Sequence, residues 1–337
     1  MNGNYTIIST FAGCGGSSLG YKWADFKELL AIDFDKNAVD TFKLNFPEIP
    51  CWQRDITTIK ASEILEFCNI KVGELDILDG SPPCQGFSTA GKRQVNDDRN
   101  DLFKSFVYLI KELQPKIFVM ENVSGMVKGK MKGKFKEIIL SLKSLNYQVK
   151  CKLLNAKYYE VPQSRQRLFF IGVRNDLNMQ PVFPEPLDKV ITVIETLKDL
   201  EELGEIKYPK NEIDKYYYQI RIGSDLAEIF EKKFNKRRYF NIKKVNPNKP
   251  CNTLTKLFSE TMSGLLHWQE KRYLTINELK ILCSYPEDFK MIGNFREQWA
   301  RLGNSVMPKQ MYYIAKTLKE KILDNYYGKS KTKTNKT

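Results

Sequence analysis

A single histidine, His267, occurs in the 337 residues of the sequence. This scarcity excludes Ser-His and Cys-His catalysis unless His267 itself is the base. The seven cysteines are scattered and include no Cys-x-x-Cys pair, which argues against a zinc knuckle and against a disulfide framework. We therefore expect no metal site, and we expect carboxylates, lysines or water to handle protons in any reaction.

Long apolar runs are also missing. No stretch approaches the roughly 18 consecutive apolar residues that a membrane helix needs. The N-terminal "MNGNYTIIST" has neither a basic n-region nor a cleavage site. A hydrophobic content of 42% is enough for a buried core. The sequence is thus typical of a globular protein that stays in the cytoplasm without membrane contact.

The first half of the chain alternates short apolar runs with amphipathic segments, as a parallel α/β sheet requires. Strands are expected at 5–9, 29–33, 75–80, 116–122, 147–156 and 167–173, with a short one before Asp55. Helices are expected at 16–24, 36–46, 58–68, 102–113 and 135–145, and later at 275–285 and 308–323. The pattern predicts an α/β fold with a doubly wound sheet.

The composition changes near residue 175, where prolines punctuate the chain and the alternation is lost. We predict four parts, namely a doubly wound domain over 1–174, a small domain of mixed structure over 175–271, a largely helical segment over 272–326 and a basic disordered tail over 327–337. No internal repeat is visible.

A glycine-rich loop, "FAGCGGSSLG", follows the first expected strand and opens the first helix. Its spacing is neither G-x-G-x-x-G nor that of a P-loop, so a standard dinucleotide site and an ATPase are both disfavoured. Asp33 ends the second strand about 20 residues on, where an acid can accept from both ribose hydroxyls of a nucleoside. Phe34 could lie on an adenine face, and Asp55 could accept from an adenine amine. A nucleoside cofactor is the leading hypothesis, and a tight turn without a ligand is the alternative.

The loop "GSPPCQGFS" (80–88) fixes the approach to Cys84, because Pro83 locks its own φ and restricts the residue before it. The sulfur could be a nucleophile, a metal ligand or a small buried group. Glu121 and Asn122 follow the next strand and should lie beside this loop. A buried acid is costly unless it is paired or used, although Glu121 could also be a structural hydrogen-bond acceptor.

Arg165 and Arg167 are separated by one residue at the start of an expected strand, so both should point to one side. Two guanidinium groups there could grip a base carbonyl or a phosphate, or one could form a salt bridge at the sheet edge. The formal net charge of +14 points toward a polyanion. The run from Lys232 to Lys256 has nine basic residues and no acid, so it either contacts phosphates or forms a solvated face.

Several motifs in a fixed order make the chain resemble the DNA (cytosine-5) methyltransferase family over nearly all its length. "FAGCGG" resembles the first cofactor motif, "GSPPCQGFS" the nucleophile loop, "ENV" the acid motif and "QSRQR" the arginine motif. "RYLTINELKILCSYPEDF" and "RLGNSVMPKQM" resemble the two late motifs, and "PCNTLTK" resembles the threonine-leucine element of the target-recognition domain.

The resemblance implies a Rossmann-like methyltransferase domain over 1–174, a target-recognition domain over 175–271 and a segment over 272–326 that packs back on the first. It implies that Cys84 is the nucleophile, that Glu121 acts on the base and that Arg165 and Arg167 position it. S-adenosylmethionine would be the cofactor and S-adenosylhomocysteine the product. The implied cofactor contacts are Phe11, Ala12, Gly13, Cys14, Gly15, Gly16, Asp33, Phe34, Asp55, Ile56, Pro82, Asn304 and Ser305. The implied DNA contacts are Gln85, Ser88, Lys236, Arg237, Arg238 and Thr253.

The substrate implied by the resemblance is a specific cytosine flipped out of double-stranded DNA. We expect a monomer in the bacterial cytoplasm or nucleoid that belongs to a restriction-modification system, alongside a restriction endonuclease that acts on the same site. A tRNA cytosine-5 methyltransferase and a catalytically silent nucleic-acid-binding relative are the alternatives.

Two departures from the family pattern concern cofactor affinity. The family usually has an acid before the Phe-Ala-Gly of its first motif, where this chain has Ser9 and Thr10. The ribose-binding acid is often glutamate, and Asp33 is one methylene shorter.

Overall fold

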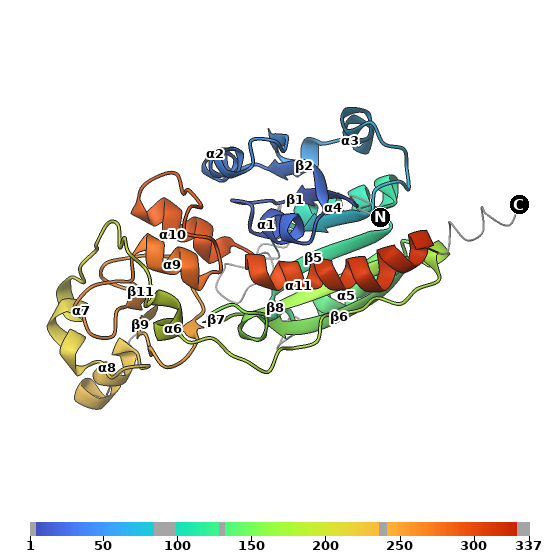
Figure 1. Ribbon diagram of the computed structural model, residues 1–337. Coiled ribbons are helices and arrows are strands. Elements are labelled where there is room, and N and C mark those ends of the chain that lie inside the picture. The colour runs from blue at the N-terminus through green and yellow to red at the C-terminus, as the bar shows by residue number, and fades with distance from the viewer. Residues whose placement is uncertain (1–4, 84–98, 128–131, 236–240, 329–337) are drawn as a thin grey trace, which may run out of the picture. The chain divides into compact units, whose positions relative to one another are not determined.

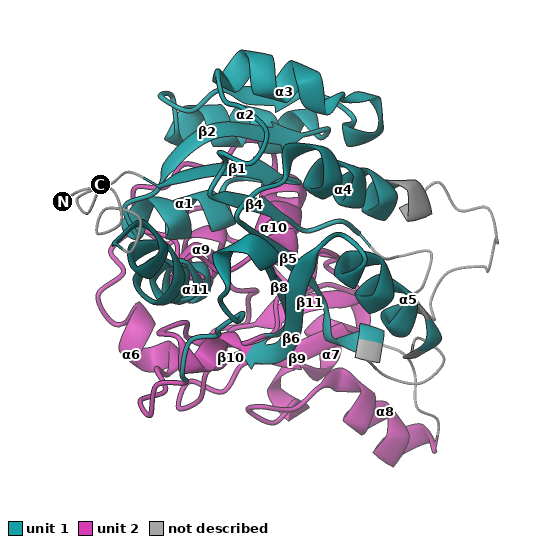
Figure 2. Ribbon diagram, turned by 90° about the vertical axis from the view of Figure 1, so that its right-hand side faces the viewer, with its two compact units in different colours: residues 1–154, 166–185, 310–337 teal, residues 155–165, 186–309 magenta. Residues whose placement is uncertain are grey.

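A computed structural model describes residues 5–83, 99–127, 132–235 and 241–328. The chain forms two compact units, which Figure 2 shows in different colours. Unit 1 comprises residues 1–154, 166–185 and 310–337, and unit 2 comprises residues 155–165 and 186–309. None of the helices in the described ranges is long and apolar enough to cross a membrane.

Unit 1 is built on a seven-stranded sheet with the strand order β3-β2-β1-β4-β5-β8-β6. Its strands are β1 (Thr6–Thr10), β2 (Lys27–Asp33), β3 (Cys51–Gln53), β4 (Ile77–Gly80), β5 (Ile117–Val123), β6 (Tyr147–Asn155) and β8 (Gln166–Arg174). The pairs from β3 to β5 are all parallel. The order reverses between β1 and β4, and ligands of such sheets bind outside the carboxyl ends of the strands at that point. The predicted doubly wound α/β fold is therefore confirmed.

One strand departs from the expected parallel arrangement. β8 pairs with β5 in the antiparallel direction, with Val123 opposite Arg167 and Glu121 opposite Phe169. The chain reaches β8 from its neighbour β6 through residues 156–165. A parallel neighbour needs a crossover of a dozen or more residues, usually a helix, and this connection is too short for one.

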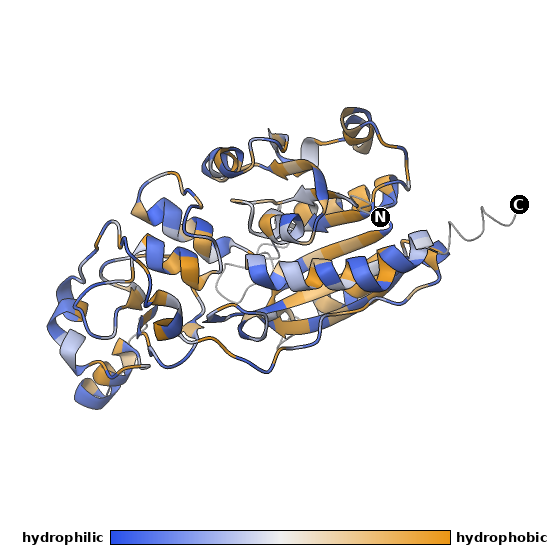
Figure 3. Cartoon of the chain, viewed as in Figure 1, coloured by the Kyte–Doolittle hydropathy of each residue, from blue (hydrophilic) through white to orange (hydrophobic). Residues whose placement is uncertain are grey.

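Helices cover both faces of the sheet in unit 1. Its helices are α1 (Gly16–Trp23), α2 (Lys36–Asn45), α3 (Ala61–Cys68), α4 (Arg99–Leu113), α5 (Lys132–Lys143) and the part of α11 (Pro308–Leu318) that starts at residue 310. α3, α4 and α5 share one hydrophobic cluster with the strand residues Ile8, Leu30 and Phe118. Figures 1 and 2 show α1 and α11 on the opposite face from α4 and α5. Because both faces are covered, central strands are apolar almost throughout, as the colouring of β5 and β8 shows (Figure 3).

Unit 2 is smaller and mixed. Its elements are β7 (Gln163–Ser164), α6 (Val193–Leu197), α7 (Asn211–Tyr216), α8 (Leu226–Phe234), β9 (Asn241–Lys244), β10 (Cys251–Asn252), β11 (Ser263–Leu266), α9 (Ile276–Leu282) and α10 (Phe295–Asn304). β9 pairs with β11, and β10 pairs with β7. A hydrophobic cluster joins α7 and α8 to β9 and β11 through residues such as Tyr217, Phe230 and Ile242.

The two compact units divide the chain at other points than the sequence analysis expected. Residues 155–165 join unit 2 because β7 pairs with β10. Unit 1 continues to residue 185, beyond the boundary expected at 174, and residues 272–309 of the expected separate segment are part of unit 2. The expected tail begins too early, because Tyr327 stacks on Tyr5 and donates a hydrogen bond to Asp76 at 2.7 Å. Residues 329–337 lie outside the described ranges.

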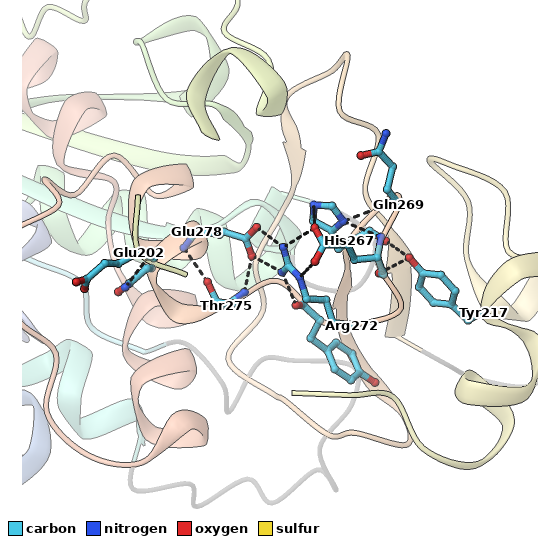
Figure 4. Close-up of polar contacts among 10 residues, drawn as sticks. Glu202, Tyr217, His267, Gln269, Arg272, Thr275 and Glu278 are labelled. Carbon is cyan, nitrogen blue, oxygen red and sulfur yellow. Dashed lines mark hydrogen bonds and ion pairs between the residues drawn. The ribbon is translucent and has the colours of Figure 1, made fainter. Parts of the chain in front are cut away.

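A buried ion pair in unit 2 connects Arg272 to Glu278 in the first turn of α9. The Arg272 guanidinium donates to both carboxylate oxygens of Glu278 at 2.8 and 3.0 Å, and both side chains are 3% exposed. Glu278 also accepts the backbone N–H of Thr275 and so closes the capping box of α9. Figure 4 shows the arginine between Glu278 and the turn that carries His267.

Replacing Arg272 with methionine should lower the free energy of unfolding by about 3–5 kcal/mol, because Glu278 would keep a buried charge without a partner. Urea unfolding followed by tryptophan fluorescence measures this change. Arg221→Met is the matched control, since Arg221 pairs with Glu228 at 2.7 Å but is 70% exposed, and its loss should cost about 1 kcal/mol or less. Equal losses in the two variants would contradict the prediction.

Candidate active site

The glycine-rich loop connects β1 to α1 at the carboxyl edge of the sheet. Phe11, Gly13 and Gly15 have positive φ angles of 55°, 57° and 93°, in the left-handed region that favours glycine. A Cβ at Gly15 would come within 2.3 Å of the Phe46 ring, so the packing behind the loop requires glycine there. A Cβ at Gly13 would meet no described atom within 4 Å, so the loop borders open space at this position. The other loop positions, Ala12, Cys14 and Gly16, are buried.

Asp33 holds the glycine loop in place. Its Oδ2 accepts the backbone N–H of Gly13 at 2.8 Å, and its Oδ1 accepts the backbone N–H of Asp35 at 2.9 Å. The acid predicted to accept from ribose hydroxyls therefore also fixes the loop that would face them.

Three further predicted cofactor residues follow β2 and β3. The Phe34 ring is 72% exposed at the carboxyl end of β2. Asp55 is exposed, and its Oδ1 accepts from the backbone N–H and the hydroxyl of Thr57, both at 2.9 Å. Ile56 is 5% exposed and packs in the hydrophobic cluster, so its side chain belongs to the core.

A carboxyl group lies behind the glycine loop although β1 supplies none. Asp79 of β4 is paired in register with Ser9 and is 4% exposed. Its side chain accepts from the hydroxyl of Tyr21 at 3.4 Å and from that of Ser17, both on α1. The Thr10 hydroxyl donates to the backbone carbonyl of Asp79 at 3.0 Å. The neighbouring strand thus provides an acid beside the position where the family pattern expects one. The sequence analysis missed Asp79, although an acid inside an apolar strand was a visible signal.

Asp79 should make the stability of the protein pH-dependent. Burial raises the pKa of Asp79 from 3.8 to about 7, and the negative charge of Glu121 adds to the shift. The carboxyl group's contribution to the free energy of unfolding is therefore fully present below about pH 4 and is lost as the pH rises to about 7. Asparagine does not titrate, so Asp79→Asn should flatten this dependence by up to about 1.4 kcal/mol per pH unit within that window. Urea unfolding at half-unit pH steps tests this, and equal slopes for both proteins would refute it.

The end of β5 is tied to the loop that follows β4. The Asn122 side chain is 4% exposed, and its Nδ2 donates to the backbone carbonyl of Pro82 at 3.1 Å. Its Oδ1 accepts the backbone N–H of Val123 at 2.9 Å. This contact fixes the backbone two residues before Cys84. Cys84 itself lies outside the described residues, together with Gln85 and Ser88.

Glu121 and Arg167 form a close pair on one face of β5 and β8. The Arg167 Nε lies 2.7 Å from Glu121 Oε1, and the two side chains are 16% and 13% exposed. The register explains the contact, since Arg167 stands opposite Val123 and diagonal neighbours across an antiparallel pair are within reach of long side chains. The pair places a positioned carboxylate one strand away from the β4 loop.

Arg165 does not share that face. The expectation that both arginines point to one side is wrong, because β8 begins at Gln166 and Arg165 lies in the turn before it. The Arg165 side chain is 2% exposed, and its Nη1 and Nη2 donate to the backbone carbonyls of Leu254 and Gly303 at 2.8 and 2.9 Å. These contacts lie within unit 2, where Arg165 stabilises the backbone at Leu254 and Gly303.

The remaining predicted residues with described positions also belong to unit 2. The Thr253 hydroxyl donates to the backbone carbonyl of Ser164 at 2.6 Å. Asn304 ends α10 with an exposed side chain, and the Ser305 hydroxyl contacts the hydroxyl of Tyr285. Unit 2 thus carries the late-motif residues, whereas unit 1 carries the glycine loop.

The single histidine has a structural position. His267 is 5% exposed, and its Nδ1 accepts the backbone N–H groups of Gln269 and Glu270 at 3.2 and 3.0 Å (Figure 4). The Tyr217 hydroxyl donates to the backbone carbonyl of His267 at 2.6 Å. Burial lowers the pKa of His267. The imidazole therefore stabilises the turn that follows it by accepting two backbone hydrogen bonds.

The basic run from Lys232 to Lys256 is not a uniform charged face. Lys244 is 6% exposed, lies 4.1 Å from the centroid of the Tyr217 ring and donates to the Tyr217 carbonyl at 3.3 Å. Burial lowers its pKa. Lys249 and Lys256, by contrast, are exposed. The predicted DNA contacts at Lys236, Arg237 and Arg238 lie outside the described residues.

Comparison with known proteins shows the family of the chain. The family model for C-5 cytosine-specific DNA methylase matches residues 5–320. The chain is 34% identical over 332 residues to the type II methyltransferase M1.HphI of Haemophilus parahaemolyticus, covering 93% of this chain and 86% of that protein. It is 32% identical over 375 residues to M.DdeI of Desulfomicrobium norvegicum, covering 94% and 88% of the two chains.

Solved structures share the fold. A prophage-encoded protein of Escherichia coli described as a DNA modification methyltransferase superposes with a TM-score of 0.74 at 25% identity, covering 95% of this chain and 99% of that chain. DNMT2 of Spodoptera frugiperda superposes with a TM-score of 0.68 at 20% identity, covering 94% and 98%.

Proposed function

The chain belongs to the C-5 cytosine-specific DNA methylase family and is a DNA cytosine-5 methyltransferase, and from this premise we propose that it modifies one cytosine of a defined duplex sequence. The type II names of its relatives support a place in a restriction-modification system. It acts as a monomer in the bacterial cytoplasm, and a restriction endonuclease cuts the same sequence when it is unmodified. The Glu121–Arg167 pair beside the β4 loop is the observation that carries the proposal.

The residues around the glycine loop fit S-adenosylmethionine, which supplies the methyl group. Open space at Gly13 leaves room for a ligand against the backbone, and the exposed Phe34 ring offers a surface for adenine. Asp33 accepts from the ribose hydroxyls. Asp55 bonds Thr57 through Oδ1 alone within the described part of the chain, so its Oδ2 is available to the adenine amine. The family resemblance also implies cofactor contacts by Asn304 and Ser305, which belong to unit 2.

Cytosine C5 is too weak a nucleophile to accept a methyl group from a sulfonium without activation. The Cys84 thiolate adds to C6 and pushes electron density onto C5, a task for which cysteine is the most nucleophilic side chain near neutral pH. Glu121 hydrogen-bonds the base at N3 and the exocyclic amine and stabilises the charge that develops. Arg167 holds Glu121 in that orientation. After methyl transfer, water removes the C5 proton and Cys84 leaves as the thiolate.

A base inside a duplex cannot reach such residues, so the target cytosine is flipped out of the stack. Residues of unit 2 read the neighbouring base pairs, with Thr253 among them. Basic side chains such as Lys249 and Lys256 neutralise phosphates, so binding weakens steeply with salt.

Methyl incorporation from labelled S-adenosylmethionine into duplex DNA and into tRNA tests the proposal. We expect label in DNA only, and bisulfite sequencing of that DNA to show one modified cytosine in one sequence. Label in tRNA alone would identify an RNA methyltransferase. Tight DNA binding without any label would identify a silent relative, and either outcome would overturn the proposal.

A further inference from the structure

Unit 2 contains a half-open hollow of about 340 Å³, a volume within the roughly 300–1,000 Å³ of small-molecule sites. It is lined by Ser164, Asn241, Lys243, Asn252, Thr253, Thr255, Gly264, Leu265 and Trp299. The lining is mostly polar, and none of these residues is acidic. The amide and hydroxyl groups of the lining can both donate and accept hydrogen bonds, and Lys243 adds one full positive charge.

One wall of the hollow is a rigid turn, residues 253–256. Arg165 Nη1 donates to the Leu254 carbonyl at 2.8 Å, and the Trp299 indole donates to the Thr255 carbonyl at 2.9 Å. A Cβ at Gly303 would come within 2.6 Å of the Thr255 backbone, so α10 packs directly on the turn. Side chains on this turn are thus held at fixed positions, which specific recognition requires.

Strand alternation separates two adjacent lysines on β9. Lys244 lies on the same side as Ile242, in the buried cluster around Tyr217. Lys243 lies on the other side with Asn241 and lines the hollow. The Lys243 ammonium makes no hydrogen bond or ion pair to any described residue, and neither does the Asn252 side-chain amide. Asn241 and Thr253, by contrast, already use their side chains on Thr255 and Ser164.

We infer that this hollow receives the edge of a guanine base in the recognition sequence and that Lys243 reads that base. Lysine donates to the O6 and N7 acceptors of guanine, the commonest specific base contact of basic side chains, and an ammonium group has no acceptor with which to read a cytosine amine. Asn252 adds a second donor at the same edge. The inference rests on the proposed function, because it assumes DNA as the substrate.

Methylation of a duplex library with randomised positions, mapped by bisulfite sequencing, tests the assignment. The wild-type enzyme should require guanine at one position of its sequence. Lys243→Gln should reduce that guanine preference by about 10- to 100-fold and leave the other positions unchanged. Lys243→Arg should retain the preference, since arginine also donates to O6 and N7.

Lys215→Gln is the matched control, because Lys215 is an exposed lysine of the same unit outside the hollow. It should leave every sequence preference unchanged. An unchanged preference in Lys243→Gln, or a uniform loss of rate at all sequences, would overturn the inference and indicate a phosphate contact or no contact. Absence of any cytosine methylation by the wild-type enzyme would instead refute the proposed function, so the two failures are distinguishable.

Discussion

Replacing Cys84 with serine should abolish both methyl transfer and the covalent capture of DNA that contains 5-fluorocytosine. A serine hydroxyl stays protonated at neutral pH and adds poorly to C6, so we expect the rate to fall by a factor on the order of 10³ to 10⁶. In the fluorinated substrate C5 carries fluorine in place of hydrogen, so no proton can be removed there after methyl transfer, and the wild-type thiolate stays bound to C6. The adduct is measured as a protein band of raised mass after denaturation.

The control for this experiment is Cys68, which is half-buried. Burial raises the pKa of Cys68 to about 11, so this thiol at the end of α3 stays protonated. Cys68→Ser should retain both the rate and the adduct. An adduct that persists in Cys84→Ser would mean that another residue is the nucleophile.

Replacing Glu121 with glutamine should lower the single-turnover rate by about 10²- to 10⁴-fold. Glutamine is nearly isosteric and can still accept from Arg167 Nε, so the fold should survive while the negative charge that stabilises the activated base is lost. DNA and cofactor affinities should change far less than the rate, because the charge matters most as the transition state forms.

The contact between Glu121 and Arg167 can be isolated by a double-mutant cycle. Arg167→Met should also lower the rate, and the double variant should lose less than the sum of the two single effects, because the side chains act as a unit. Glu63→Gln is the matched control, since Glu63 pairs with Arg54 at 2.7 Å at a more exposed site. Rates of Glu121→Gln within a few-fold of wild type would exclude the proposed role.

The sequence predicted the elements of unit 1 well, for a physical reason. Parallel strands buried on both faces are apolar almost throughout, and their helices have a clear amphipathic period, so segments such as 29–33 and 102–113 stand out. Asp33 and Glu121 were predictable because each acid stands near the carboxyl end of such a strand. These signals are local, and the strands' shared edge brings their ends together.

The parts that escaped prediction depend on contacts between distant segments. Arg165 was expected to point to the same side as Arg167 at the start of a strand, but its side chain is bound by the carbonyl groups of Leu254 and Gly303. Asp79 is tolerated in a buried strand because hydroxyl groups of α1 reach it. Lys244 belongs to a core because an aromatic ring covers it. The hydrophobic periodicity of a short segment does not predict such contacts between distant residues.

The contacts that hold the backbone of residues 253–256 constrain how this enzyme could acquire a new specificity. Arg165 holds the turn from a segment that precedes it, and Trp299 and Gly303 hold it from a helix that follows. If a segment that ends before Cys251 were exchanged with a related protein, residues 253–256 would keep their contacts with Arg165, Trp299 and Gly303. An exchange that includes residues 253–256 would also need compatible residues at those three positions. Changes within residues 253–256 are therefore coupled to Arg165, Trp299 and Gly303, which lie far from this segment in the sequence.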